Sequence, residues 1–333
     1  MLKRKVPFIY FLLLIPTCCL ATYLGCNYYY SLKSIEQAAE YKSSSPSCGL
    51  IVKRLKDYKY IQPLVTIKQG CESENLQPLR DELVTTIENY KQSGALSTAS
   101  VYMRVFGQGE WICINDAESY RPGSLLKVPE LITFLRWNEK HPGYLDKVLT
   151  YSKAFTSNKH VLYTSKSIEV GKSYTIRELL KYMIEYSDNN ATILLNNNMD
   201  ATEFKKTFTE LGFKEPDMKA SDYPINIKDY SQFFESLYNA GLLNIENSEF
   251  AMELLSHSDF KSGLLGGLPD TTMIAHKFGE AGDDKIHELH ECGIIYSGNK
   301  RYEITVMTKG NDYSKLSDVI KNISKIAYQR MNG

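Results

Sequence analysis

The sequence predicts an α/β fold of the α+β type, in which a five-stranded antiparallel sheet is flanked by terminal helices and carries an inserted all-helical lobe. Strand-like runs occur in two groups, one before and one after a long block dominated by helical patterns. Each group also has one amphipathic helix with an apolar face to bury. Because five strands are too few for two separate sheets, pairing both groups in one sheet is the economical arrangement.

The elements follow this order along the chain. A helix is predicted where Leu79, Leu83 and Ile87 recur at four-residue spacing. Residues 98–115 alternate apolar and polar side chains on both sides of a Gly-Gln-Gly turn, which predicts a β-hairpin. The helical lobe spans about residues 121–265. Three short strands are predicted at residues 272–279, 291–297 and 302–308, and a final helix at residues 314–328.

The amino terminus carries a membrane signal. Residues 3–5 are basic, and no further charge occurs before Lys33. The apolar run Val6–Leu24 exceeds the roughly 7 to 15 residues of a cleavable signal and approaches the roughly 20 that span a bilayer. We therefore expect residues 1–26 to be a membrane anchor or signal-anchor, with the rest of the chain extracytoplasmic. Cys26 leaves a lipoprotein as the alternative.

Residues 27–75 are predicted to be a juxtamembrane spacer and lead-in, because their first part is polar and rich in serine. Residues 76–333 form the predicted catalytic domain. Cys48 and Cys71 flank one segment and are able to bridge in an oxidising compartment, although sequence does not fix connectivity. Lysine plus arginine balances aspartate plus glutamate at 39 each, so no charge excess indicates a nucleic-acid partner.

Three serines have a lysine three residues later, at Ser124, Ser258 and Ser297. Only Ser124 follows a turn, opens a helix and lies at the predicted seam between sheet and helical lobe. A helix start offers free N–H groups to a developing negative charge. Lys127 lies one turn on in an apolar run, where burial should lower its pKa and supply a neutral amine within reach of Ser124. The alternative is that Ser124 caps the helix and Lys127 extends to solvent.

Two further motifs favour the catalytic interpretation. Ser187-Asp188-Asn189 precedes an apolar helix in the lobe, and Lys277-Phe278-Gly279 ends a predicted strand of the sheet. Each has an ordinary structural explanation, such as a helix cap at Ser187 or Asp188. Their order predicts that both face Ser124 across one seam.

Taken together, the three motifs resemble those of class A β-lactamases and penicillin-binding proteins, from about Leu76 to the carboxyl end. The resemblance implies that Ser124 is the acylated nucleophile and Lys127 its base or proton relay. It implies that Ser187 passes a proton to the leaving nitrogen and that Lys277 supplies positive charge to Ser187 and to a substrate carboxylate. It implies neither a cofactor nor a metal.

The resemblance also implies substrate-binding residues. Asn189 would hydrogen-bond the amide side chain of the substrate. Gly279, the glycine that ends the third motif, matches the family and would also line the substrate site. Backbone N–H groups of Ser124 and Glu280 would form an oxyanion hole. Phe278 departs from the family, which usually carries a threonine or serine there. Without that hydroxyl, binding of a substrate carboxylate is expected to be weaker.

A second departure concerns release of the acyl group. Asp222-Tyr-Pro-Ile-Asn226 has the spacing of the Glu-x-x-Leu-Asn segment that activates the deacylating water in class A enzymes, with a shorter acid. With a working base the enzyme hydrolyses β-lactams. Without one it resembles a penicillin-binding DD-peptidase acting on cell-wall peptides, or a membrane-anchored sensor without efficient chemistry.

Overall fold

The computed structural model describes residues 48–56, 58–155, 163, 165–217 and 223–333, together with Thr22 and Gly25. The chain divides into a unit of residues 1–49 and a unit of residues 50–333, which carries the fold. No helix in this described part is long and apolar enough to cross a membrane. Apart from Thr22 and Gly25, the anchor predicted at residues 1–26 lies outside the described residues.

A five-stranded sheet forms the centre of the fold, and its strands pair antiparallel throughout. The hairpin predicted at residues 98–115 lies at one side of the sheet, and the three later strands complete it. The order across the sheet is β4 (Glu110–Ile114), β3 (Thr98–Val105), β11 (Lys300–Gly310), β10 (His287–Ser297) and β9 (Met273–Gly282). The predicted fold class is therefore confirmed, with β9 as an edge strand.

The strands form where side chains alternate between the two faces of the sheet. In β3, Val101, Met103 and Val105 contribute to one hydrophobic core, whereas Tyr102 contributes to the core on the opposite face. Both faces are buried, which explains why this strand has almost no exposed position. The sheet therefore requires a layer on each side.

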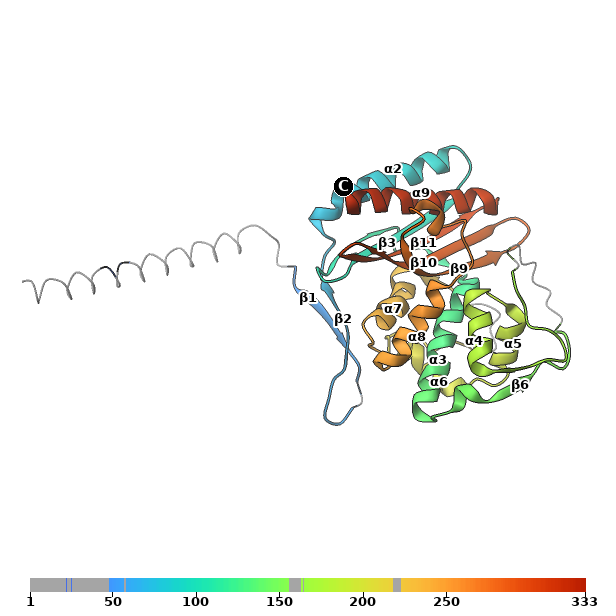
Figure 1. Ribbon diagram of the computed structural model, residues 1–333. Helices are drawn as coiled ribbons and strands as arrows, with labels where there is room; N and C mark the ends of the chain where they lie inside the picture. The colour runs from blue at the N-terminus through green and yellow to red at the C-terminus, as the bar shows by residue number, and fades with distance from the viewer. Residues whose placement is uncertain are drawn as a thin grey trace, which may run out of the picture. The chain divides into compact units, whose positions relative to one another are not determined.

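The two terminal helices cover one face and lie side by side there (Figure 1). Helix α2 (Gln77–Gln92) buries Leu79, Leu83 and Ile87, the predicted apolar stripe. Helix α9 (Tyr313–Asn332) is capped by Asp312, whose carboxylate accepts hydrogen bonds from two backbone N–H groups of its first turn. Their apolar residues share the core that contains Phe278.

The helical lobe covers the opposite face (Figure 1). Helix α7 contacts strands β3, β10 and β11 and so joins the lobe to the sheet. The helices of the lobe are α3 (Lys127–Lys140), α4 (Ile176–Glu185), α5 (Asn189–Asn196), α6 (Ala201–Thr209), α7 (Ile227–Tyr238) and α8 (Ile245–Ser256). The short elements are η1 (Glu74–Leu76), β5 (Ser119–Tyr120), η2 (Gly123–Leu126), η3 (Tyr144–Asp146), β6 (Val148–Thr150), β7 (Ser173–Thr175), β8 (Ile225–Asn226) and η4 (Leu265–Gly267).

A two-stranded hairpin precedes these elements, formed by β1 (Leu50–Arg54) and β2 (Leu64–Gln69). It falls within residues 27–75, for which the sequence predicted a spacer and lead-in. Val65 of β2 is buried, and the backbone of Gly241 lies so close that a side-chain carbon there would come within 2.9 Å of the Val65 Cα. The hairpin is thus packed against the domain.

The cysteines that lie within the described residues fall into two classes. Cys48 and Cys71 are disulfide-bonded, whereas Cys113 and Cys292 are free and buried. Burial raises the pKa of Cys113 to about 12, so its thiol stays protonated at neutral pH. The two buried thiols therefore act as small core side chains.

Candidate active site

Ser124 lies in the short turn η2, which leads directly into helix α3. Two glycines allow this turn to approach strand β9. A side-chain carbon at Gly279 would lie 2.3 Å from Pro122 O, and one at Gly123 would lie 2.1 Å from Glu280 O. Gly123 also has a positive φ of 54°. Ser124 is therefore held beside the Gly279–Glu280 part of the edge strand.

A buried tyrosine supports the same turn from the lobe. The hydroxyl of Tyr230 on α7 donates a hydrogen bond of 3.0 Å to Leu125 O, the carbonyl next to Ser124. Tyr230 is fully buried, so the bond is shielded from water. Sequence reasoning missed this residue, because its 105-residue separation from Leu125 leaves no local signal.

Lys127 begins helix α3 and is buried. Its Nζ donates to three atoms of the second motif: Ser187 O at 2.5 Å, Ser187 Oγ at 3.1 Å and Asn189 Oδ1 at 2.9 Å. The Ser124 hydroxyl is not among the acceptors that Lys127 has within the described part of the chain. The structure thus brings Lys127 to Ser187 and Asn189, whereas the expected direct bond to Ser124 is not formed.

Ser187 occupies a strained position between the two lysines. Its φ is 52°, a left-handed value that is uncommon outside glycine. Its Oγ lies 3.1 Å from Lys127 Nζ and 2.9 Å from Lys277 Nζ. Asp188 caps α5 by accepting from Asn190 N and also accepts from Ile168 N, which fixes the loop around the serine. Strain supported in this way is typical of functional sites.

Lys277 is buried completely. Its Nζ donates to Ser187 Oγ and, at 3.0 Å, to Phe278 O. Burial, followed by the nearby positive charge of Lys127, holds the pKa of Lys277 well below its usual value of 10.5. A lowered pKa favours the neutral amine, the form that accepts a proton, so Lys277 is a candidate proton-transfer partner for Ser187 on the sheet side.

Phe278 stands where the family usually has a hydroxyl. Its ring stacks on Phe260 with centroids 4.2 Å apart, and the Tyr163 ring meets it edge-on at 5.0 Å. The Lys277 Nζ lies 4.1 Å from the centre of the Phe278 ring, a cation–π distance. The ring therefore belongs to the core between sheet and terminal helices and covers Lys277 from that side.

The remaining predicted site residues are also placed by the structure. Asn189 is the first residue of α5, and Glu280 lies on β9, where its carboxylate accepts from Tyr163 N at 3.2 Å. Asn226 caps α7 through the Asp229 N–H. Asp222 lies outside the described residues, so its predicted role stays a prediction.

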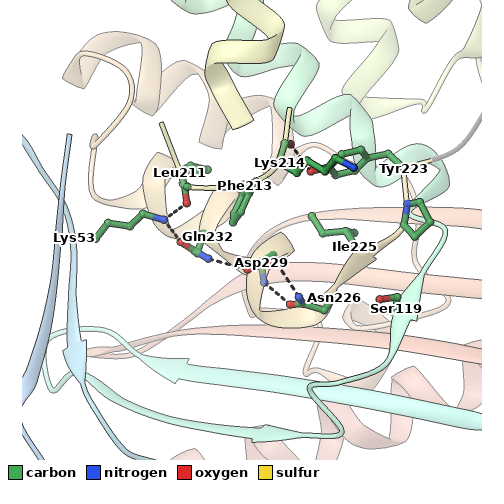
Figure 2. Close-up of a pocket in the computed structure, with 12 residues that line it drawn as sticks. Lys53, Ser119, Leu211, Phe213, Lys214, Tyr223, Ile225, Asn226, Asp229 and Gln232 are labelled. Atoms are coloured by element: carbon green, nitrogen blue, oxygen red, sulfur yellow. Dashed lines mark hydrogen bonds between the residues drawn. The ribbon is translucent and has the colours of Figure 1, made fainter. Parts of the chain in front are cut away.

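A separate pocket lies between the hairpin, the loop after α6 and helix α7 (Figure 2). Lys53, Ser119, Tyr223 and Asp229 are among the residues that line it. No member of the three motifs lines this pocket, so the chemistry assigned to the motifs does not take place there.

The sheet, the helical lobe and the three motifs at their seam define the class of β-lactamase-like serine hydrolases. The model of a β-lactamase enzyme family matches residues 79–331, which is most of the chain. The protein therefore belongs to the β-lactamase enzyme family. No curated protein matches it.

Solved structures share the fold. PBP-A is 21% identical, with a TM-score of 0.65 over 79% of this chain and 98% of its own. A PBP-A variant, solved as an acyl-enzyme complex with penicillin G, is 21% identical, with a TM-score of 0.63 over 77% and 97%. A β-lactamase from Chitinophaga pinensis DSM 2588 is 19% identical, with a TM-score of 0.67 over 77% and 100%. At these identities the likeness establishes the fold.

Replacing Tyr230 by phenylalanine tests the support of the nucleophile turn. Loss of the bond removes the side-chain donor to Leu125 O, which keeps only the backbone N–H of Lys127, and should destabilise the protein by about 0.5–1.5 kcal/mol. A shifted Ser124 should also slow acylation by about tenfold or more, since misplacements of about 1 Å cost a hundredfold. Thermal unfolding and acylation kinetics with a β-lactam measure the two effects.

Tyr144→Phe is the matched control, because Tyr144 donates a comparable 2.8 Å bond to Asn198 O. We expect it to cost stability without slowing acylation. Equal acylation rates in Tyr230→Phe and the unchanged protein would show that this bond does not position Ser124.

Proposed function

We propose that this protein hydrolyses the amide bond of β-lactams through an acyl-enzyme on Ser124. One observation carries the proposal: the Ser187 hydroxyl lies between two buried lysine Nζ atoms, one following the Ser124 turn and one on the strand packed against that turn. A simple helix cap at Ser124 requires neither lysine to be buried. The penicillin acyl-enzyme of the PBP-A variant supports the same chemistry in a protein of this fold.

In the proposed acylation, Ser124 Oγ attacks the carbonyl carbon of the lactam and loses its proton to a neutral lysine amine. The oxyanion is stabilised by the N–H groups of Ser124 and Glu280, each worth about 3 kcal/mol. The C–N bond then breaks, and Ser187 gives its proton to the leaving nitrogen. Ser187 is re-protonated from the lysine that received the first proton, so the proton is conserved.

Lys127 and Lys277 have different parts in this proposal. In this proposal Lys127, which follows Ser124 by three residues and donates to Ser187 Oγ, relays the proton between the two serines after its Nζ turns towards Ser124. Lys277 reaches Ser187 from the sheet and holds its hydroxyl in place. Asn189, which accepts from Lys127, fixes the relay and is the proposed contact for the substrate amide.

The test is incubation of the full chain with a chromogenic cephalosporin, followed by both absorbance and intact mass. Steady colour change without a lasting adduct supports β-lactam turnover. A lasting adduct supports slow release, as expected for a penicillin-binding peptidase or a sensor. If neither a colour change nor an adduct is observed, the acyl-enzyme proposal is refuted.

Replacing Asp222 by asparagine tests the proposed base for release. If its carboxylate activates the deacylating water, hydrolysis of the acyl-enzyme should slow by about a hundredfold or more. The adduct should then accumulate at an unchanged acylation rate, which time-resolved intact mass measures. Asp270→Asn, an exposed position, is the control. Unchanged release in Asp222→Asn would remove Asp222 from the site.

We further propose that the domain works outside the cytoplasm, anchored by residues 1–26. The basic residues 3–5 followed by a long uncharged apolar run support this orientation. The disulfide-bonded state of Cys48 and Cys71 also supports it, since such bonds persist in oxidising compartments. Protease accessibility of the domain on intact cells tests the placement.

A further inference from the structure

The β1–β2 hairpin exposes an unusual apolar face. In its register Val52 lies opposite Ile67, and Arg54 lies opposite Leu64. Residues directly opposite one another point to the same face of an antiparallel pair. The face therefore carries four large apolar side chains, with exposed fractions of 68% for Leu50, 47% for Val52, 40% for Leu64 and 40% for Ile67. Apolar patches of this kind mark interaction surfaces.

The loop that joins the two strands adds aromatic side chains. Tyr58, Tyr60 and Ile61 are exposed by 49%, 85% and 60%. Tyrosine, with an apolar ring and a polar hydroxyl, is enriched where protein meets the interface of a bilayer. The apolar face of the strands and the loop thus form one hairpin surface, made of residues 50, 52, 58–61, 64 and 67.

Charge distinguishes this surface from the rest of the molecule. Residues 50–69 contain five basic residues and one acidic residue, whereas the whole chain is balanced at 39 of each. Arg54, Lys56 and Lys59 are exposed beside the apolar face and the tyrosines. Exposed apolar and basic side chains together fit an anionic lipid surface.

The hairpin is held rigidly by its other side, so the surface is preformed. Lys53 reaches from β1 to Leu211 O and to the Gln232 side chain (Figure 2). Trp111 Nε1 donates to Gln69 O at 2.7 Å, and Thr66 Oγ1 donates to Glu235 at 3.0 Å. Because these bonds fix the hairpin to the domain, binding costs little further ordering.

The length of the preceding chain also suits a membrane partner. The predicted anchor ends near Leu24, and β1 begins at Leu50. The residues between them span at most about 90 Å when fully extended. The hairpin is therefore the part of the described fold that lies nearest along the chain to the predicted bilayer segment.

We propose that the hairpin surface binds an anionic lipid bilayer and orients the catalytic domain on it. The apolar face and the tyrosines enter the headgroup region, and Arg54, Lys56 and Lys59 contact lipid phosphates. This proposal is independent of the chemistry at Ser124.

The test uses the full chain reconstituted into vesicles whose acyl chains carry bromine, a short-range quencher of tryptophan. Tyr60→Trp places a reporter on the hairpin surface, and Val148→Trp is the matched control. Val148 is 58% exposed, and β6 lies at the far end of the domain from β1 (Figure 1). Vesicles of phosphatidylglycerol with phosphatidylcholine are compared with phosphatidylcholine alone.

We expect the added tryptophan of Tyr60→Trp to lose about half of its intensity or more in anionic brominated vesicles, and that of Val148→Trp to change little. The loss should shrink when salt rises from about 0.1 to about 0.5 M. It should also shrink in the combined variant Lys56→Gln with Lys59→Gln. Unchanged unfolding temperatures show that these exposed substitutions leave the fold intact.

Three outcomes would overturn the proposal. Equal quenching of both reporters would mean that the hairpin has no preferred lipid contact. A blue shift of Tyr60→Trp that follows protein density and not brominated lipid would identify a second copy of the chain as the partner. A blue-shifted emission of Tyr60→Trp that is already present without vesicles, and that brominated lipid does not quench, would show that another part of the chain covers the surface.

Discussion

Replacing Ser124 by alanine is expected to abolish the covalent adduct with β-lactams. Alanine lacks the Oγ that forms the ester, and the other hydroxyl of the site, Ser187 Oγ, is assigned to proton transfer and not to attack. Turnover should fall by about a thousandfold or more, and the residual activity would come from substrate binding and the oxyanion hole. Stability should change little, since Ser124 is only partly buried. Intact mass after exposure to a penicillin measures the adduct directly.

Ser297→Ala provides a matched control, because Ser297 has the same spacing to its lysine. The structure pairs Ser297 with Lys300 at the turn between β10 and β11, remote from helix α3. We expect this variant to label normally. An adduct that persists in Ser124→Ala would show that the wrong serine has been assigned.

The fold was predictable because it depends on patterns of short range. Alternation in β3 indicates a strand, the apolar stripe of α9 specifies which side of that helix is buried, and the sheet then pairs the two groups of strands. The hairpin at residues 50–69 was not predicted. Its apolar side chains face outward, so the usual link between apolar pattern and core does not apply.

The site was predicted in its members and less well in its contacts. The spacing of Ser124 and Lys127 places both on one side of a helix start, which suggested a direct bond. An ammonium has three donors, and Lys127 finds three acceptors on Ser187 and Asn189 instead. Those acceptors converge because Ser187 adopts a left-handed conformation, which single-sequence reasoning does not reveal.

Replacing Lys277 by methionine is expected to slow acylation by about a hundredfold or more and yet to stabilise the fold. The rate falls because Ser187 loses its partner for proton transfer. Stability rises, by about 1–2 kcal/mol, because methionine fills similar space and the cost of taking the lysine amino group out of water is removed. Acylation kinetics and chemical denaturation measure the two effects. A variant that loses both activity and stability would mean that Lys277 is a structural residue.

The stabilisation should depend on pH with a definite sign. Burial and the charge of Lys127 depress the pKa of Lys277 in the folded state, whereas the unfolded lysine keeps its proton up to its usual value of 10.5. Between the folded pKa and 10.5 the unfolded state binds more protons, so the stability of the unchanged protein rises with pH.

Lys277→Met removes this contribution. Its stability advantage should therefore be larger at pH 6 than at pH 9, as denaturation at both values would show. Lys285→Met, at an exposed lysine of the β9–β10 turn, should alter neither activity nor the pH slope. If the advantage of Lys277→Met is the same at both pH values, the lysine is charged throughout, and Lys277 then acts on Ser187 as a fixed positive charge.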